Sequence, residues 1–224
     1  MKTASFVRHE ELVPGVWQAF FRPDSPLDYL PGQYVELILP AAPDDPRGPQ
    51  RTFTLTTLPS EEVVGFIYRA DEPMSPYKQV LQSLEVGTEV RLGEVLGDLV
   101  LPKLSTVPLI FIAGGIGMAS FTAMLKQLSQ HSEQRTVHLF YSLRSQYDDA
   151  FKAQVDSFPF ASKNRYIQPN RLDVNDILQV ANSDSLIYLS GSEPYVQSLR
   201  DQLHALGFSH SQIVFDYYDG YADL

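Results

Sequence analysis

The sequence predicts two domains, an antiparallel β-barrel or sandwich followed by a doubly wound parallel α/β domain. In the first half, short runs of β-forming residues are separated by Pro, Gly and Asp. From Pro108 onward, strand-like and helix-like segments alternate. The second half opens with the nearly continuous apolar run "PLIFIA", which is typical of a buried parallel strand. The join is expected within "LPKLSTVP", and the domains are therefore assigned to residues 1–104 and 105–224.

The first domain is expected to contain five strands and one helix. The helix is predicted over 75–84, with Ser75 as its N-cap and Pro76 at its first helical position. The predicted strands span 16–23, 33–40, 51–57, 63–70 and 88–95.

The second domain is expected to contain five strands and four helices. Its last helix is strongly amphipathic and is closed by Gly207. Right-handed crossovers would place these strands in one parallel sheet. The predicted strands span 108–113, 136–142, 165–168, 185–191 and 212–218, and the predicted helices span 118–130, 147–158, 173–182 and 194–207.

Composition excludes several classes of protein. The 224 residues are 44% hydrophobic and 12% aromatic, which indicates a folded core. A net charge of -10, from 17 basic and 27 acidic residues, argues against a general nucleic-acid binder. With no cysteine, these residues hold no disulfide, iron–sulfur cluster or cysteine metal site. No signal core and no apolar run of about 20 residues is present, so we expect a soluble cytoplasmic protein without membrane insertion.

Two glycine turns favour a nucleotide ligand. Gly114, Gly115 and Gly117 lie between a predicted strand and helix, where glycine lets a phosphate approach backbone N–H groups. Ser120 stands where the third glycine of a dinucleotide fingerprint would be, so a tight strand-to-helix turn is the alternative. Residues 190–194 form a second turn, and "FYSLRS" ends a strand between the two. All three converge on the carboxyl edge of the sheet, where ligands bind in this architecture.

Arg51 opens the otherwise uncharged strand "RTFTL". Its guanidinium fork matches a phosphate, but an exposed arginine at the start of a strand is equally compatible with this pattern. The arginine alone leaves both alternatives open.

The ordered set "PGQYVEL", "RTFTL", "SPYKQVL", "GTEVRLGEVLGDLVL", "AGGIGMASF", "FYSLRS" and "SGSEPYV" resembles the ferredoxin–NADP reductase family of flavoenzymes. The resemblance covers nearly the whole chain. It implies a six-stranded flavin-binding barrel followed by a nucleotide-binding α/β domain. A flavin would lie between the two and accept hydride from a nicotinamide cofactor.

The resemblance implies specific flavin contacts. Arg51 would pair with a flavin phosphate, Phe53 would lie against the flavin, and Thr54 would place a hydroxyl near flavin N5. Ser75 would help to cradle a pyrophosphate, which favours FAD over FMN, although a plain N-cap role is also compatible. Arg69 would add a charge contact or be a solvated strand residue.

On the nicotinamide side, Ser190 replaces the cysteine usual in the family, and Ala119 and Ser120 replace Thr-Pro. Arg144 follows the second strand of the domain, where an arginine favours the 2′-phosphate of NADPH over NADH. The neighbouring acids Asp148 and Asp149 argue the other way.

At the C-terminus, Tyr217 or Tyr218 would cover the flavin, unless both are ordinary core aromatics. Asp216 would be a proton relay, and Arg171 a second phosphate contact. In full, the resemblance implies catalytic roles for Thr54, Ser190, Asp216 and Tyr217, and cofactor contacts at Arg51, Thr52, Phe53, Thr54, Tyr68, Arg69, Met74, Ser75, Gly114, Gly115, Gly117, Met118, Arg144, Arg171, Gly191, Tyr217 and Tyr218.

The implied function is an oxidoreductase that passes hydride from NADPH or NADH to bound FAD, and then single electrons to ferredoxin, flavodoxin or another redox carrier protein. It would be a monomer and bind no metal. One alternative is the reductase component of an oxygenase, or a free flavin or ferric reductase. A nucleotide-sensing or adaptor domain is the non-enzymatic alternative.

Overall fold

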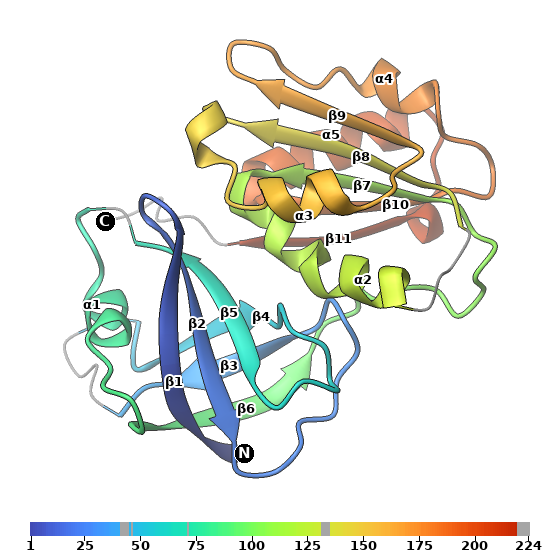
Figure 1. The fold of residues 1–224 in the computed structure, drawn as a ribbon. Helices are drawn as coiled ribbons and strands as arrows, with labels where there is room; N and C mark the ends of the chain where they lie inside the picture. The colour runs from blue at the N-terminus through green and yellow to red at the C-terminus, as the bar shows by residue number, and fades with distance from the viewer. Residues whose placement is uncertain (41–44, 46, 71, 131–134, 219–224) are drawn as a thin grey trace.

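The computed structural model describes residues 1–40, 45, 47–70, 72–130 and 135–218 (Figure 1). Part of the Pro- and Asp-rich stretch after residue 40 and the last six residues lie outside this description. The described residues form a six-stranded antiparallel sheet and a five-stranded parallel sheet with helices on both faces. The predicted fold class is therefore confirmed.

The antiparallel sheet closes into a barrel. Its strand order is β4-β3-β6-β1-β2-β5, and an antiparallel bridge between Leu55 and Phe66 joins its two outer strands. Helix α1 (Pro76–Gln82) lies between β5 and β6 in sequence, and Ser75 caps it by accepting a hydrogen bond from the Lys78 amide at 3.4 Å. The strands are β1 (Lys2–Val13), β2 (Val16–Pro23), β3 (Tyr34–Ile38), β4 (Gln50–Thr54), β5 (Val64–Arg69) and β6 (Glu89–Leu96).

Strand β1 is an element that sequence reasoning missed. Its second half is charged, with Arg8, Glu10 and Glu11, and shows no clear apolar alternation. Only Ala4 and Phe6 are buried in the barrel core. Pairing with β2 on one side and β6 on the other forms this strand, and those contacts are not visible in its local sequence.

The parallel sheet has the strand order β11-β10-β7-β8-β9. Helices α2 and α3 pack on one face and α4 and α5 on the other, so the domain is doubly wound (Figure 1). The strands are β7 (Leu109–Gly114), β8 (Val137–Leu143), β9 (Ser162–Ile167), β10 (Leu186–Ser192) and β11 (Ile213–Tyr218). The helices are α2 (Ala119–Gln130), α3 (Lys152–Ser157), α4 (Val174–Leu178) and α5 (Glu193–Ala205), with short 3-10 helices η1 (Gly115–Met118), η2 (Gln146–Asp148) and η3 (His210–Gln212).

The chain leaves β7 toward β8 on one side and returns to β7's other side as β10. The β7–β10 boundary is therefore the topological switch point, where open α/β sheets bind ligands beyond the strand ends. Both predicted glycine turns lie at this boundary. The predicted helix 147–158 is instead split into η2 and the shorter α3.

The two units share an apolar interface. One buried cluster joins Val16 and Ile67 of the barrel to Met118 and Met124 beside the parallel sheet. Gly32 has a φ of 101° and lies so close to its neighbours that a Cβ would sit 1.9 Å from the Leu99 carbonyl oxygen.

The boundary expected between residues 104 and 105 falls in the connection from β6 to β7 and stays a prediction. Within the described residues, we find no helix long and apolar enough to cross a membrane.

Candidate functional site

Four hydroxyl groups from both units meet at the switch point. The Tyr218 hydroxyl oxygen lies 3.2 Å from Thr54 Oγ1 and 2.9 Å from Ser120 Oγ. Ser120 Oγ is in turn 3.0 Å from Ser190 Oγ. We call Thr54, Ser120, Ser190 and Tyr218 the hydroxyl cluster.

Backbone geometry explains the meeting. Thr54 is the last residue of β4, and Ser190 and Tyr218 lie near the carboxyl ends of the neighbouring strands β10 and β11. Ser120 is in the first turn of α2, directly after η1. Parallel strands end at the same edge of a sheet. The side chains of Ser190 and Tyr218 therefore come together at this edge, and Thr54 of the barrel contacts Tyr218 there.

The hydroxyl cluster is enclosed. Ser120 and Ser190 are fully buried and Thr54 is nearly so. Burial raises the pKa of the Tyr218 hydroxyl above its usual value, and the hydrogen bonds from Ser120 and Thr54 only partly oppose this effect. The phenol is therefore neutral at physiological pH, and in each of its two hydrogen bonds either hydroxyl can be the donor.

Sequence reasoning placed Thr54, Ser190 and Tyr218 at the site but assigned no role to Ser120. The available signal was its position in the first turn of a helix that follows a glycine loop. Ser120 is the residue that links Ser190 to Tyr218.

The structure distinguishes the two C-terminal tyrosines. Successive residues of a strand point to opposite sides, so only one of the two can face the barrel. Tyr218 enters the hydroxyl cluster, whereas Tyr217 is exposed and stacks on Phe215 with 6.4 Å between ring centroids. Asp216, which precedes Tyr217 on β11, is half-buried, and its charge further raises the pKa of Tyr218.

The glycines at the switch point serve different purposes. A Cβ on Gly114 or Gly191 would lie 2.9 Å or 3.0 Å from the ring of Tyr195. A Cβ on Gly117 would lie 2.4 Å from the Ser190 carbonyl oxygen, so this glycine lets η1 pack on β10. Gly115 has a φ of 53°, and a Cβ there would meet nothing within 4 Å. Of these four glycines, Gly115 alone presents its backbone to open space.

On the barrel side, Arg51 forms an ion pair with Asp45 of the same chain. Its Nη2 lies 2.5 Å from Asp45 Oδ1, and the Asp45 side chain is almost completely buried. Its Nη1 donates to the carbonyl oxygens of Gly48 and Gln50 at 2.9 and 2.5 Å. Arg51 is therefore a half-buried, hydrogen-bonded group rather than a solvated residue at the start of a strand.

Aromatic residues of the barrel lie beside Arg51. Its guanidinium stacks over the Tyr77 ring at 4.8 Å, and Phe53 stacks on the same ring at 6.2 Å between centroids. Phe53 remains partly exposed.

The buried Tyr68 hydroxyl has no hydrogen-bond partner among the described residues, an unusual state that a ligand atom would relieve.

The remaining predicted residues are more dispersed. Ser75 uses its hydroxyl as the α1 cap. Met118 is fully buried in the core, Thr52 is exposed, and Met74 is half-buried. Arg69 lies 3.9 Å from Asp148 across the two units.

The nucleotide edge carries exposed arginines. Arg144 and Arg171 are both exposed, and the structure gives neither an ion pair within the described ranges. Asp149 is buried and paired with Arg165 at 3.0 Å. Both acids that oppose a 2′-phosphate thus already have a cationic partner, Asp148 in Arg69 and Asp149 in Arg165.

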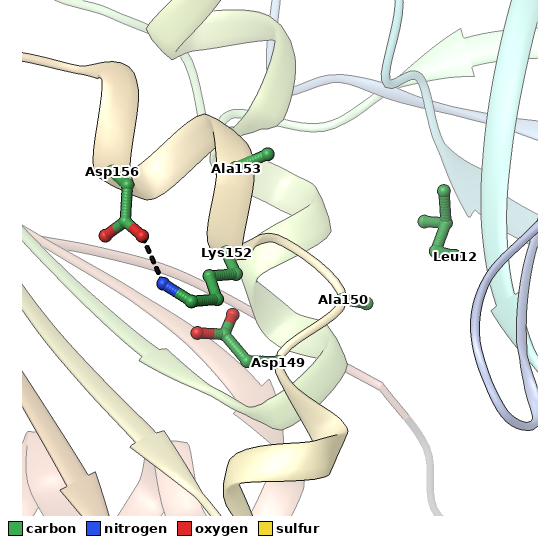
Figure 2. A pocket seen from close by; sticks show the side chains of 6 residues that line it. All are labelled: Leu12, Asp149, Ala150, Lys152, Ala153 and Asp156. Carbon is green, nitrogen blue, oxygen red and sulfur yellow. Dashed lines mark hydrogen bonds and ion pairs between the residues drawn. The ribbon is translucent and has the colours of Figure 1, made fainter.

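A separate depression of about 410 Å³ lies between Leu12 and the segment from Asp149 to Asp156 (Figure 2). An ion pair of 2.5 Å between Lys152 and Asp156 lines it. It includes no residue of the hydroxyl cluster or of the glycine turns. We therefore place the candidate site at the hydroxyl cluster and not in this depression.

The chain offers groups that fit a flavin and a nicotinamide nucleotide. Thr54 and the partnerless Tyr68 hydroxyl lie on β4 and β5, the strands whose bridge closes the barrel. The open backbone at Gly115 and the exposed Arg144 lie at the adjoining sheet edge. Within the described residues, no group of acidic and histidine side chains is arranged to hold a metal ion.

Known proteins resemble this chain in sequence. It is 28% identical over 212 residues to the toluate 1,2-dioxygenase electron transfer component of Pseudomonas putida, covering 85% of this chain and 59% of that protein. It is 25% identical over 210 residues to the propane 2-monooxygenase reductase component of Rhodococcus jostii (strain RHA1), covering 84% and 55%. The chain thus spans less than two thirds of these relatives. No family model matches the sequence.

Solved structures share the fold. Phthalate dioxygenase reductase superposes with a TM-score of 0.81 at 17% identity, covering 99% of this chain and 69% of that one. A ferredoxin NADP+ reductase from Neisseria gonorrhoeae, solved with bound FAD and NADP, has a TM-score of 0.78 at 14% identity, covering 96% and 97%. These neighbours confirm the fold that the resemblance to the ferredoxin–NADP reductase family implies, an antiparallel barrel followed by a doubly wound parallel α/β unit.

Proposed function

We propose that this chain is an NAD(P)H-dependent flavoprotein reductase. The observation that carries the proposal is the hydroxyl cluster, in which Thr54 of the barrel meets Ser120, Ser190 and Tyr218 of the α/β unit at the switch point. A hydride acceptor on the barrel and a nicotinamide on the sheet edge would come together at this place. FAD, when bound, would accept the hydride of NAD(P)H and release electrons one at a time.

The residues of the chain would act by positioning. Thr54 would offer its hydroxyl to the reacting edge of the flavin, and Arg51 would bind a flavin phosphate by charge-assisted hydrogen bonds. Tyr68 would gain a partner for its buried hydroxyl. Gly115 would let the nucleotide approach the backbone, and Tyr218 would cover the flavin until the nicotinamide displaces it. Alignment of the two rings, rather than acid–base chemistry, would supply most of the acceleration.

The electron acceptor is the second part of the proposal. A carrier protein such as ferredoxin or flavodoxin is one candidate. The relatives named as electron transfer or reductase components of a dioxygenase and a monooxygenase favour a second candidate, the reductase function of an oxygenase system. Turnover with a panel of acceptors, namely ferredoxin, flavodoxin, free flavin and ferric chelates, would separate these functions. Monomeric state and a cytoplasmic location stay predictions.

Two measurements test the central proposal. The purified protein should be yellow, with flavin absorption bands, and should release FAD rather than FMN on denaturation. In stopped-flow mixing without oxygen, NADPH or NADH should bleach the flavin band in a saturable manner. A protein that binds flavin but is reduced by neither nucleotide would support the sensing or adaptor alternative instead.

A further inference from the structure

Asp45 occupies the anion position that the proposed flavin phosphate needs. The Asp45 carboxylate is almost fully enclosed and collects three donors: Arg51 Nη2 at 2.5 Å, the Arg47 amide at 3.0 Å and the Tyr77 amide at 3.2 Å. Backbone amides and a guanidinium are the donors that a phosphate also selects. Asp45 lies six residues before Arg51, so the chain itself supplies this anion.

Little of the guanidinium remains for a second anion. Nη1 is directed at backbone carbonyl oxygens, and one face of the group lies over the Tyr77 ring. Nη2 is committed to Asp45, while the buried Nε has no hydrogen-bond partner among the described residues. With Nη1 directed at carbonyl oxygens, the Nε–Nη2 edge is the one left to bind an oxyanion with two parallel hydrogen bonds, and Asp45 uses only half of it.

Electrostatics opposes occupancy of this edge by two anions. A phosphate brought to Nε and Nη2 would lie beside a carboxylate with no solvent between them, and like charges at that distance repel strongly. Burial would raise the pKa of Asp45, but the hydrogen bonds from the Arg47 and Tyr77 amides and from Arg51 outweigh it, so its pKa lies below the usual range. The carboxylate is therefore charged at neutral pH and does not leave by protonation.

We infer that Asp45 is an internal competitor for the phosphate of the flavin cofactor: it holds Arg51 in the ligand-free protein and must be displaced when the cofactor binds. This inference rests on the proposed flavin-binding function. Its consequence is a weakened cofactor affinity, because the protein binds only from the fraction of molecules in which Arg51 is released. The pair also stabilises the ligand-free barrel by preventing an uncompensated buried charge.

The test is a flavin titration of the whole chain by fluorescence quenching, with FAD and riboflavin as probes. If Arg51 is released in about one molecule in ten or fewer, Asp45→Asn should lower the Kd for FAD by about tenfold or more. Riboflavin carries no phosphate, so its Kd should not change. The ligand-free variant should unfold at a lower temperature than the wild type. Tighter binding by a less stable protein is a combination that a purely structural role would not give.

Three further variants sharpen the result. In an Arg51→Ala background, Asp45→Asn should change FAD affinity by less than about twofold, because the competition acts through Arg51. Asp149→Asn removes a buried partner of an arginine elsewhere and should leave flavin affinity unchanged. Asp45→Ser should repeat the gain in FAD affinity and covers the case in which Asp45→Asn does not fold.

The outcomes are distinguishable. Unchanged or weaker FAD binding in both neutral Asp45 variants would overturn the inference and make Asp45 a support for Arg51. An equal gain for riboflavin and FAD would also overturn it, since the effect would then be a general opening of the barrel. If neither the wild type nor any variant bound flavin, the proposed function itself would fail.

Discussion

Replacing Tyr218 by phenylalanine tests whether the hydroxyl cluster holds the C-terminal strand over the flavin position. The change keeps the ring and removes one oxygen. That oxygen contacts Thr54 Oγ1 at 3.2 Å and Ser120 Oγ at 2.9 Å. Ser120 keeps its 3.0 Å contact with Ser190, whereas no other hydrogen bond is recorded for the Thr54 hydroxyl within the described residues.

The magnitude follows from these contacts. A hydrogen bond of this kind contributes about 0.5–1.5 kcal/mol net, so Tyr218→Phe should lower the unfolding free energy of the ligand-free protein by about 1–2 kcal/mol. If the nicotinamide must displace Tyr218 to reach the flavin, binding breaks the same hydrogen bonds in the wild type. The variant should therefore bind the nucleotide more tightly, and about 1.4 kcal/mol corresponds to about tenfold in Kd.

Two assays measure these effects. Urea unfolding of the ligand-free protein gives the change in stability. Stopped-flow reduction over a range of NAD(P)H concentrations gives the Kd of the nucleotide separately from the rate of hydride transfer. Tyr217→Phe is the matched control: it makes the same chemical change one residue away, on an exposed ring outside the hydroxyl cluster.

Equal effects of the two substitutions would refute the reasoning, since the position of Tyr218 would then be irrelevant. So would a Tyr218→Phe variant with lowered stability but an unchanged Kd for the nucleotide. In that case Tyr218 would tie the two units together without standing in the path of the nicotinamide.

Three further predictions address the nucleotide edge and the buried tyrosines. Gly115→Val and Gly115→Asn should both raise the KM for the nucleotide with FAD retained, because either side chain fills the open space beside the backbone. Asparagine tolerates the positive φ of 53° at this position, whereas valine does not. A rise in KM with valine alone would therefore indicate backbone strain rather than blocked access of the nucleotide. Arg144→Ala should lower the catalytic efficiency with NADPH by about tenfold and leave that with NADH nearly unchanged; a wild type that prefers NADH would show that the acids dominate. Burial raises the pKa of Tyr29, Tyr188 and Tyr195 to about 12. A buried neutral tyrosine contributes its full stabilisation below about pH 10, the pKa of tyrosine in the unfolded chain, and loses it as the pH rises toward 12. The urea concentration at the unfolding midpoint should therefore stay constant from pH 7 to 9 and fall between about pH 10 and 12.

The fold could be predicted from the sequence because its local signals agree with one another. The apolar run ending at Ala113, the glycines after it and the helix-forming segment 118–130 each indicate the same strand–turn–helix unit. The exceptions are segments whose structure depends on distant partners. Strand β1 is formed by pairing with β2 and β6, although its charged second half lacks the alternation of a half-buried strand.

The candidate site was predicted less completely, for a related reason. Motif position could indicate Thr54, Ser190 and the C-terminal tyrosines, but which tyrosine faces the barrel depends on the register of β11 against β10. Gly191 pairs with Tyr217 and Ser192 with Tyr218, a register that the sequence does not reveal. Ser120 was considered only as a departure from the glycine fingerprint and from the Thr-Pro of the family loop, without a role of its own.

The largest departure from expectation is at Arg51, whose anionic partner comes from the chain itself. Asp45 and Tyr218 now have a common interpretation. Each satisfies a polar group that the proposed flavin would contact, Asp45 at the phosphate end and Tyr218 beside Thr54. A ligand-free barrel that buried Arg51 without an anion would bear the cost of an unpaired charge, so internal partners favour a folded protein before the cofactor arrives. The same partners must weaken cofactor binding, because each contact is broken as the ligand replaces it. If both act in this way, Asp45→Asn and Tyr218→Phe should each lower ligand-free stability, but the first should tighten flavin binding and the second nucleotide binding.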